Sequence, residues 1–203
     1  MKIKNLIITG LALVSMLSTT GCDDFLDQNL KTELAPSNTF TSTYGFDVGT
    51  AGLYALTRSE YNTYGEKGAY MHDRPCPYET LQIATDIADI GLGDGSLTPF
   101  AYLNLTAGEK LVETYWRWAY GLISSANEIL VFSESNSNWD HPTDKERFQA
   151  EARFFRAYAY RLLIYLYGDV PYVDTILYDF QLNFTRTPRA EVLGHIFEAP
   201  EFS

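Results

Sequence analysis

Apolar residues recur at helical spacing in three long segments of the chain, residues 43–61, 106–134 and 144–167. At this spacing the side chains fall on one face of a helix, which the fold can bury. A shorter fourth helix is predicted after them, with Thr187 as its N-cap and Pro188 at its first position. The pattern therefore predicts a mainly α-helical protein.

The first predicted helix has four apolar positions on one face, and three glycines lie among them. The apolar positions are Tyr44, Val48, Ala51 and Ala55. The glycines are Gly45, Gly49 and Gly52. Glycine lowers helix propensity, but it permits the close approach of a neighbouring helix.

One face of the second predicted helix is mostly apolar, with positions four, three, four and three residues apart. They are Trp116, Tyr120, Ile123, Asn127 and Leu130. This spacing predicts that Trp116 packs in the core, whereas Trp118 lies off this face. Thr106 and Glu109 have the spacing of a capping box at the start of the helix.

The third predicted helix is apolar on two faces, which indicates that it lies between neighbours. One stripe contains Phe148, Ala152, Phe155, Ala159, Leu162 and Leu166, and the other contains Phe154, Tyr158 and Tyr165. Three arginines interrupt them and are expected to extend to water or to pair with carboxylates such as those of Glu109 and Glu128: Arg153, Arg156 and Arg161.

Both ends of the third helix carry recognisable signals. Thr143 and Glu146 form a second capping-box pattern, which opens the helix at Asp144. Gly168 suits a left-handed cap, and Pro171 prevents the helix from continuing.

The segments between the helices are predicted to be irregular. Frequent Gly and Pro break residues 61–105, in which a short helix is expected over residues 78–90. Residues 169–186 read as extended or looped, with Tyr172, Val173 and Ile176 as possible strand residues. Loops on a rigid scaffold are common places for binding residues.

Residues 1–21 have the features of a lipoprotein signal peptide. Lys2 and Lys4 precede an apolar run that is too short to span a bilayer comfortably, and Thr19-Thr20-Gly21-Cys22 follows it. Cleavage would leave Cys22 as a lipidated N-terminus that tethers the protein to a membrane. An ordinary secretory signal with an incidental Cys is the alternative. Residues 22–42 read as a polar tether, and residues 43–203 as the helical domain.

Composition narrows the classes of partner. The formal net charge is −11, and basic clusters are absent from the sequence, so binding to nucleic acid is not expected. Only two Cys are present, and lipidation of Cys22 would leave Cys76 without a partner for a disulfide.

Four segments resemble the SusD/RagB family of outer-membrane nutrient-binding lipoproteins, in the family's order. The first is the lipobox with the following Cys-Asp-Asp-Phe-Leu-Asp, and the second runs from Trp116 to Asn127. The third reads Glu-Ala-Arg-Phe-Phe-Arg-Ala-Tyr-Ala-Tyr and continues to Leu-Tyr-Gly-Asp-Val-Pro, and the fourth is Arg186-Thr187-Pro188. The third is the most specific.

This resemblance implies a tetratricopeptide-like helical solenoid with long irregular loops. It also implies a lipoprotein on the extracellular face of the outer membrane. Such a protein binds nutrients, most often glycans, delivers them to a SusC-like TonB-dependent transporter, and has no catalytic residues or cofactor. The family's proteins are longer, and their fourth helix continues differently from Phe197-Glu198-Ala199-Pro200, so a truncated chain is expected.

The resemblance places ligand contacts partly in the loop before the second long helix. In this chain the loop is residues 91–105, where Tyr102 and Asn104 are the candidate contacts. An aromatic ring can stack on the apolar face of a sugar, and an amide can bind its hydroxyls. Trp139, in the turn between two long helices, is a third candidate as an exposed aromatic, with capping of the helix pair or contact with the transporter as alternatives.

Other kinds of chemistry have weaker support in the sequence. Asp86, Asp89 and Asp94 lie near glycines, but their spacing is not that of an EF-hand calcium loop. The three histidines are scattered, so no zinc site is predicted. Two other hypotheses stay open: a helical-repeat adaptor that binds only protein, and an exported glycosidase that uses a pair such as Asp86 and Asp89.

Overall fold

The computed structural model describes residues 36–60, 82–83, 85–88, 98–136, 138–179 and 181–197. The chain divides into two units, Met1–Ala35 and Pro36–Ser203, and all of these residues belong to the second. The predicted signal peptide, the lipidation site Cys22 and residues 22–35 of the predicted tether lie outside the described residues.

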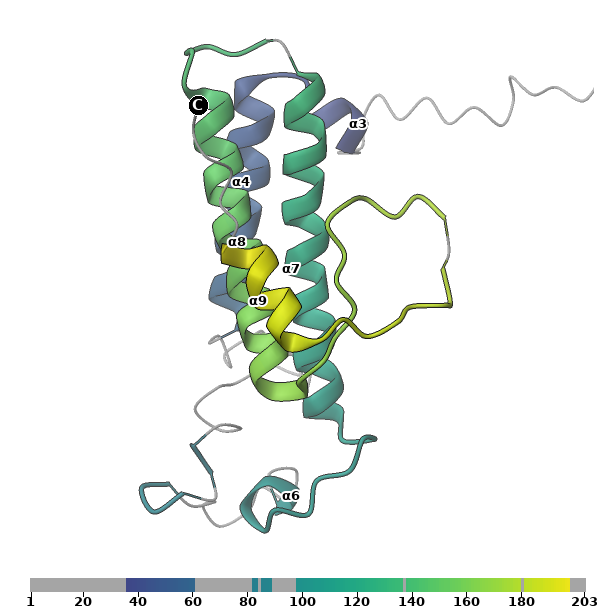
Figure 1. The fold of residues 1–203 in the computed structure, drawn as a ribbon. Helices are drawn as coiled ribbons and strands as arrows, with labels where there is room; N and C mark the ends of the chain where they lie inside the picture. The colour runs from purple at the N-terminus through teal and green to yellow at the C-terminus, as the bar shows by residue number, and fades with distance from the viewer. Residues whose placement is uncertain are drawn as a thin grey trace, which may run out of the picture. The chain divides into compact units, whose positions relative to one another are not determined.

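Three long helices stand side by side and form the scaffold (Figure 1). They are α4 (Thr43–Ser59), α7 (Lys110–Ser135) and α8 (Asp144–Tyr167), and each packs against the other two. The short helix α9 (Arg189–Phe197) packs on α8. The predicted mainly α fold is thus confirmed, and the described residues contain no strand longer than an isolated bridge.

None of the described helices combines the length and the apolar character that a membrane span requires.

Helix α4 confirms the first predicted helix, but the predicted face is wrong. Ser42 accepts a hydrogen bond from the Gly45 backbone N–H and caps the helix. The buried positions are Thr43, Gly45, Phe46, Thr50 and Leu53. The four apolar positions chosen from the sequence are exposed, because Phe46 and Leu53 fill the space towards α7 and α8 more completely.

Two of the three glycines of α4 permit a close approach, and their neighbour is the chain just before the helix. A Cβ on Gly45 would lie 1.7 Å from the Thr39 carbonyl oxygen, and one on Gly49 would lie 2.5 Å from the Phe40 ring. A Cβ on Gly52 would meet nothing. The short helix α3 (Pro36–Thr39) and the buried Phe40 therefore belong to the helical unit, so the predicted tether is wrong over residues 36–42.

Helix α7 begins at Lys110, four residues later than predicted. Thr106 donates to the Glu109 carboxylate in a turn ahead of the helix, and the N-cap Glu109 makes no side-chain capping bond. The capping box predicted there is therefore wrong. Of the predicted face, Ile123 and Asn127 are buried, and Trp116, Tyr120 and Leu130 are half-buried against the core. The helix also buries residues that were not on the predicted face: Tyr115, Trp118, Ala119, Leu122, Ala126 and Ile129.

Helix α8 begins at Asp144 as predicted, but through a different cap. Thr143 makes no capping bond; the Asp144 carboxylate instead accepts the His141 backbone N–H at 2.9 Å. The first apolar stripe is confirmed, since Phe148, Ala152, Phe155, Ala159 and Leu162 are buried. The second stripe is wrong for Phe154 and Tyr165, whose side chains are 64% and 78% exposed.

The three arginines of α8 do not pair with Glu109 or Glu128. Arg156 donates to the side-chain oxygen of Asn127 at 2.9 Å and to the Asp174 carbonyl at 3.3 Å. Arg153 donates to Gln149 of its own helix, and the guanidinium of Arg161 lies 5.4 Å from the Tyr158 ring centroid. Contacts with amides, carbonyls and a ring replace the predicted ion pairs.

After α8 the chain turns at Gly168, which has φ 74° and ψ −121°. The predicted positive φ is confirmed, although ψ differs from that of a left-handed helix. Residues 169–186 are irregular, and Tyr172, Val173 and Ile176 form no strand. Val170 and Thr187 pair as an isolated bridge, and the Asp169 carboxylate accepts the N–H of Arg189, where α9 begins, one residue after Pro188.

Candidate functional site

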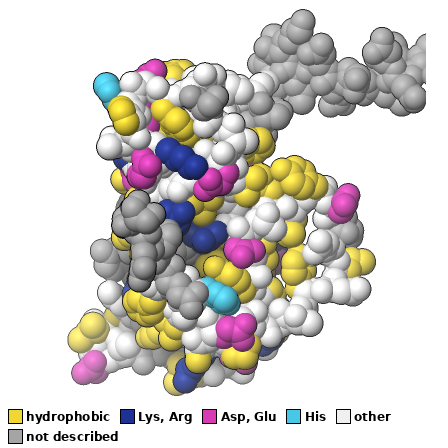
Figure 2. Space-filling view, turned by 45° about the horizontal axis from the view of Figure 1, so that its top comes forward, with side chains coloured by type: hydrophobic (Ala, Val, Ile, Leu, Met, Phe, Trp, Pro, Cys, Tyr) yellow, Lys and Arg dark blue, Asp and Glu magenta, His cyan; other side chains and the backbone are white. Residues whose placement is uncertain are grey.

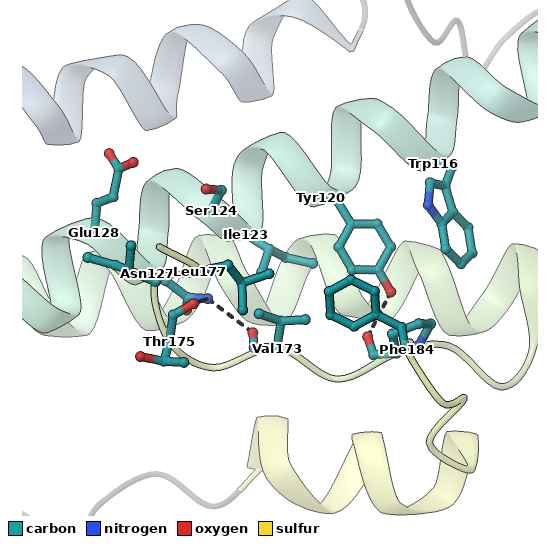
Figure 3. Close-up of a pocket in the computed structure, with 12 residues that line it drawn as sticks. Trp116, Tyr120, Ile123, Ser124, Asn127, Glu128, Val173, Thr175, Leu177 and Phe184 are labelled. Carbon is teal, nitrogen blue, oxygen red and sulfur yellow. Dashed lines mark hydrogen bonds between the residues drawn. The ribbon is translucent and has the colours of Figure 1, made fainter. Parts of the chain in front are cut away.

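A cleft of about 340 Å³ lies between α7 and the irregular segment that follows α8 (Figure 3). We call it the α7 cleft. Its lining residues come from these two parts of the chain: Trp116, Tyr120, Ile123, Ser124, Asn127, Glu128, Pro171, Val173, Thr175, Ile176, Leu177 and Phe184. A cleft of this volume is within the range of small-molecule binding sites.

Two side chains of α7 hold the loop wall of the cleft by its backbone. The Tyr120 hydroxyl donates to the Pro171 carbonyl at 2.7 Å. The fully buried Asn127 donates from its amide nitrogen to the carbonyls of Val173 at 3.0 Å and Thr175 at 3.2 Å. Irregular backbone has no ladder partners, so these side chains satisfy carbonyls that would otherwise be unpaired.

Helix α8 fixes the same loop from the other side. The Tyr160 hydroxyl lies between both backbone groups of Val173: it donates to the carbonyl at 3.0 Å and accepts the N–H at 2.6 Å. Burial raises the pKa values of Tyr120 and Tyr160, so both phenols stay protonated and able to donate at physiological pH. These two phenols therefore hold the loop wall by neutral hydrogen bonds over a wide pH range, beside the bond from the Arg156 guanidinium to the Asp174 carbonyl.

Aromatic rings form one end of the cleft. Trp116 and Tyr120 have ring centroids 4.9 Å apart, and Trp116 meets Tyr167 edge to face at 5.1 Å. Phe184 lines the cleft together with the rings of Trp116 and Tyr120 (Figure 3). Trp118, by contrast, is 9% exposed and donates to the Leu56 carbonyl at 2.8 Å. Trp118 is buried in the core. Trp116, which we expected in the core, is half-buried: it packs against the core and also lines the cleft.

Polar side chains lie towards the other end. Figure 3 shows Glu128, Asn127 and Thr175 at that end, with the Glu128 carboxylate and the Ser124 hydroxyl at the rim, turned away from the loop. Burial raises the pKa of Glu128. In the part of the chain that the structure describes, Glu128 has no cation paired with it. The α7 cleft thus offers both aromatic surface and hydrogen-bonding groups.

The candidate ligand contacts predicted from the sequence do not line this cleft. Tyr102 and Asn104 follow the single-turn helix α6 (Thr98–Ala101), and both side chains are exposed. The Asn104 backbone N–H donates to the Pro99 carbonyl at 2.9 Å, and Leu103 between the two residues has φ 53°. These two residues therefore sit on a tight exposed turn, and their role in binding stays a prediction.

Trp139 differs from the exposed aromatic that the sequence suggested. Its ring is half-buried and packs against Phe46 at 4.7 Å and Phe148 at 5.9 Å between ring centroids. This position matches the alternative in which Trp139 covers the end of the helix pair. A ligand contact by Trp139 also stays a prediction.

Of the three aspartates that lie near glycines in the sequence, the structure describes only Asp86. Asp86 is exposed in a short turn between Thr85 and Ala88, which form an isolated bridge where part of a short helix was expected. Asp89 and Asp94 lie outside the described residues. Within the described ranges, no three His, Cys, Asp or Glu side chains come together at a spacing that could hold a metal ion.

Sequence reasoning missed the loop half of the cleft, above all Phe184 and Leu177. An available signal was the segment of residues 176–184, whose described residues are irregular although the segment carries six large apolar residues in the sequence: Ile176, Leu177, Tyr178, Phe180, Leu182 and Phe184. Apolar side chains on an irregular segment often mark a packed or binding loop.

The chain resembles known proteins in sequence. It is 30% identical to SusD-like protein P2 of Formosa agariphila over 184 residues. The aligned region covers 89% of this chain and 34% of that protein. The chain is 26% identical to SusD-like protein P25 of the same organism, over 85% of this chain and 32% of that protein. The chain thus spans about a third of the length of these curated relatives.

A solved structure shares the fold. The crystal structure of a SusD-like carbohydrate binding protein from Bacteroides fragilis superposes with a TM-score of 0.54 and 21% sequence identity, over 78% of this chain and 30% of that one. A family model described as starch-binding associating with outer membrane matches residues 24–198. That description is of binding proteins. The chain therefore belongs to the SusD-like family.

Proposed function

We propose that this protein is a surface-exposed outer-membrane lipoprotein that binds glycans and delivers them to a SusC-like TonB-dependent transporter. The observation that carries the proposal is the family match over residues 24–198, a family described as starch-binding and associating with the outer membrane. The related Bacteroides fragilis structure is that of a carbohydrate binding protein, which supports the same class of ligand.

The proposed mechanism is capture and delivery without bond chemistry. A rigid bundle of α4, α7 and α8 presents irregular segments at its side and end, and such segments are where binding residues tend to lie. Lipidation of Cys22 would hold this bundle at the membrane, and the transporter would receive the ligand. A lipid anchor tethers a protein without a spanning helix.

A glycan array tests the binding part of the proposal. The chain is expected to bind at least one glycan, and Tyr102→Ala is expected to weaken that binding. Tyr165→Ala is the matched control, because Tyr102 and Tyr165 are 74% and 78% exposed. Equal binding by both variants would exclude Tyr102 as a contact, and absence of binding to every glycan would reject the proposal.

A conservative substitution is required to test whether Trp139 contacts the ligand. Trp139→Ala would remove packing against Phe46 and Phe148, so loss of binding could reflect loss of folding. Trp139→Phe keeps an aromatic ring in place. A fall in glycan binding at an unchanged melting temperature would support Trp139 as a contact, whereas a fall in melting temperature alone would make it a packing residue.

A second candidate function is a helical-repeat adaptor of the outer membrane that binds only another protein. Exposed aromatic side chains on the scaffold favour it, namely Tyr44 and Tyr54 of α4 and Phe154 and Tyr165 of α8. Figure 2 shows hydrophobic side chains exposed among charged ones on one face. Co-purification with a TonB-dependent barrel fits both functions, so glycan binding is the measurement that separates them.

A further inference from the structure

The α7 cleft is elongated along its helix. Trp116 and Glu128 line it from positions twelve residues apart, which at 1.5 Å of rise per residue corresponds to about 18 Å along the axis of α7. Figure 3 shows Trp116, Tyr120 and Phe184 at one end and Asn127, Glu128 and Thr175 at the other. One small ring cannot touch both ends, so a ligand that uses the whole cleft has several units.

The aromatic end is suited to the faces of sugar rings. The C–H groups on a pyranose face are apolar and pack on aromatic rings, while the hydroxyls point outward. Phe184 is 45% exposed, so its ring can accept a further contact. The Tyr120 hydroxyl is engaged by the Pro171 carbonyl, which leaves its ring as the contacting surface.

The polar end offers groups whose hydrogen bonds are not used within the described chain. Asn127 is not among them, because its amide nitrogen and oxygen both serve the loop and Arg156. The hydroxyls of Ser124 and Thr175 and the carboxylate of Glu128 have no hydrogen bond to another described residue. A carboxylate accepts hydrogen bonds and a hydroxyl both donates and accepts, which suits sugar hydroxyls.

The loop wall is preformed. Tyr120, Asn127, Tyr160 and Arg156 all bind its backbone, from two different helices. These bonds fix residues 171–175, so a ligand that enters the cleft does not have to order this part of the wall, and the entropic cost of binding is lower than for an unanchored loop.

We propose that the α7 cleft binds a short linear oligosaccharide along α7, with sugar faces against Trp116, Tyr120 and Phe184. Its hydroxyls are bound by Thr175 and by Glu128 and Ser124, which lie at the rim and turn towards the ligand by a change of side-chain rotamer. This inference rests on the proposed glycan-binding function and names a site for it. It is a different site from the exposed turn of Tyr102 and Asn104.

The test is isothermal titration of the full chain with maltotriose and with glucose, since starch is the polymer that the family's description names. Maltotriose is expected to bind at least about tenfold more tightly than glucose, because one ring cannot span the cleft. Phe184→Ala and Glu128→Gln are each expected to weaken maltotriose binding by about tenfold.

Leu182→Ala is the matched control. Leu182 lies on the same loop, is 78% exposed and does not line the cleft, so its variant is expected to bind maltotriose like the unchanged chain. Melting temperatures within about 3 °C of the unchanged chain would show that the variants fold. Tryptophan fluorescence adds a local readout: the change on binding is expected to disappear in Trp116→Phe.

The outcomes separate this inference from the proposed function. Glycan-array binding without a response to maltotriose, or maltotriose binding unaffected by Phe184→Ala and Glu128→Gln, would overturn the inference and leave the proposed function standing. Equal affinity for glucose and maltotriose would also overturn it. Absence of binding to every glycan would reject both.

Discussion

At the scale of single residues, the Asn127 side chain connects three parts of the structure. It is fully buried on α7, its amide nitrogen donates to two loop carbonyls, and its oxygen accepts from Arg156 of α8. One side chain thus joins two helices and the loop wall of the cleft. The sequence placed Asn127 among apolar residues of one face, but its polar partners come from segments about 29 to 48 residues away in the chain.

We predict that Asn127→Ala lowers the free energy of unfolding by about 1–3 kcal/mol, because the Thr175 carbonyl loses its side-chain donor and the Val173 carbonyl and the Arg156 guanidinium each lose one of two partners. Urea denaturation followed by circular dichroism measures the change. Asn183→Ala, at an exposed loop position, is the control and is expected to alter stability by about 0.5 kcal/mol or less. Equal effects of the two substitutions would contradict the assigned role.

Glu60 is a second residue whose surroundings have a measurable consequence. It follows α4, is 1% exposed and accepts a hydrogen bond from the Tyr158 hydroxyl at 2.6 Å. Burial raises the pKa of Glu60, and this outweighs the opposing effects of the Tyr158 hydrogen bond and of Arg161. The folded state therefore holds this proton more tightly than the unfolded chain does.

The sign of the pH dependence follows from that difference. Between the ordinary pKa of 4.5 and the higher folded value, the folded state binds more protons, so the contribution of Glu60 to stability falls as the pH rises through this window. We predict that Glu60→Gln removes this part of the pH dependence and increases stability near pH 7 relative to the unchanged chain. Denaturation at several pH values between 4 and 8 measures it, and parallel curves would contradict the prediction.

At the scale of secondary-structure elements, the helices follow local signals, but their orientation follows packing. The faces of α4 illustrate the difference: Tyr44 is 77% exposed although it belongs to the periodic apolar set, whereas Phe46 is fully buried. Helical spacing alone gives several overlapping apolar stripes in a chain this rich in aromatics, with 15 Tyr and 12 Phe. The side on which the neighbouring helices lie selects one of them.

The glycines of α4 give a prediction at this scale. Gly45→Ala is expected to destabilise the protein, because its Cβ would lie 1.7 Å from the Thr39 carbonyl oxygen and would push α3 away from α4. Gly52→Ala meets open space and is expected to stabilise by about 0.5–1 kcal/mol through helix propensity. Melting temperatures of the two variants should therefore move in opposite directions; a shift of both in the same direction would argue against the close approach.

At the scale of the whole molecule, the described part is a scaffold whose connecting segments carry the candidate sites. Hydrogen bonds from α7 and α8 fix the loop after α8, while the turn with Tyr102 and Asn104 is exposed. The bundle therefore positions a cleft on its side and a turn before α7. Both belong to one helical unit, Pro36–Ser203.

The tether gives the prediction for the whole molecule. In cells that process bacterial lipoproteins, Cys22→Ala is expected to move the protein from the membrane fraction to the soluble fraction, because acylation of Cys22 would be lost. The purified variant is expected to bind glycans as tightly as the unchanged chain. Cell fractionation and the glycan array measure the two effects, and a Cys22→Ala variant that stays in the membrane fraction would contradict lipid anchoring at this residue. Cys76→Ala is the control.

The sequence by itself determined the mainly α class, the long helices to within a few residues at most ends, and the family. These features depend on local patterns: the periodicity of residues 144–167, the stop at Gly168, and a specific aromatic segment. The predicted capping boxes were wrong because a capping box requires particular backbone angles at the N-cap residue. The residue types of the motif alone do not determine those angles. Thr143, for example, has φ −97° and ψ 2° and makes no capping bond.

Only the tertiary structure decided which faces are buried and where the cleft lies. Trp116 and Trp118 are two residues apart, and the packing of α4 and α8 put Trp118 in the core and left Trp116 at the cleft. The α7 cleft is also lined by Phe184, which is 68 residues beyond Trp116 in the chain. The loop that carries Phe184 begins at residues 171–175, whose backbone Tyr120, Asn127 and Tyr160 hold. Periodicity reports which residues share a helix face, but long-range contacts determine what that face meets.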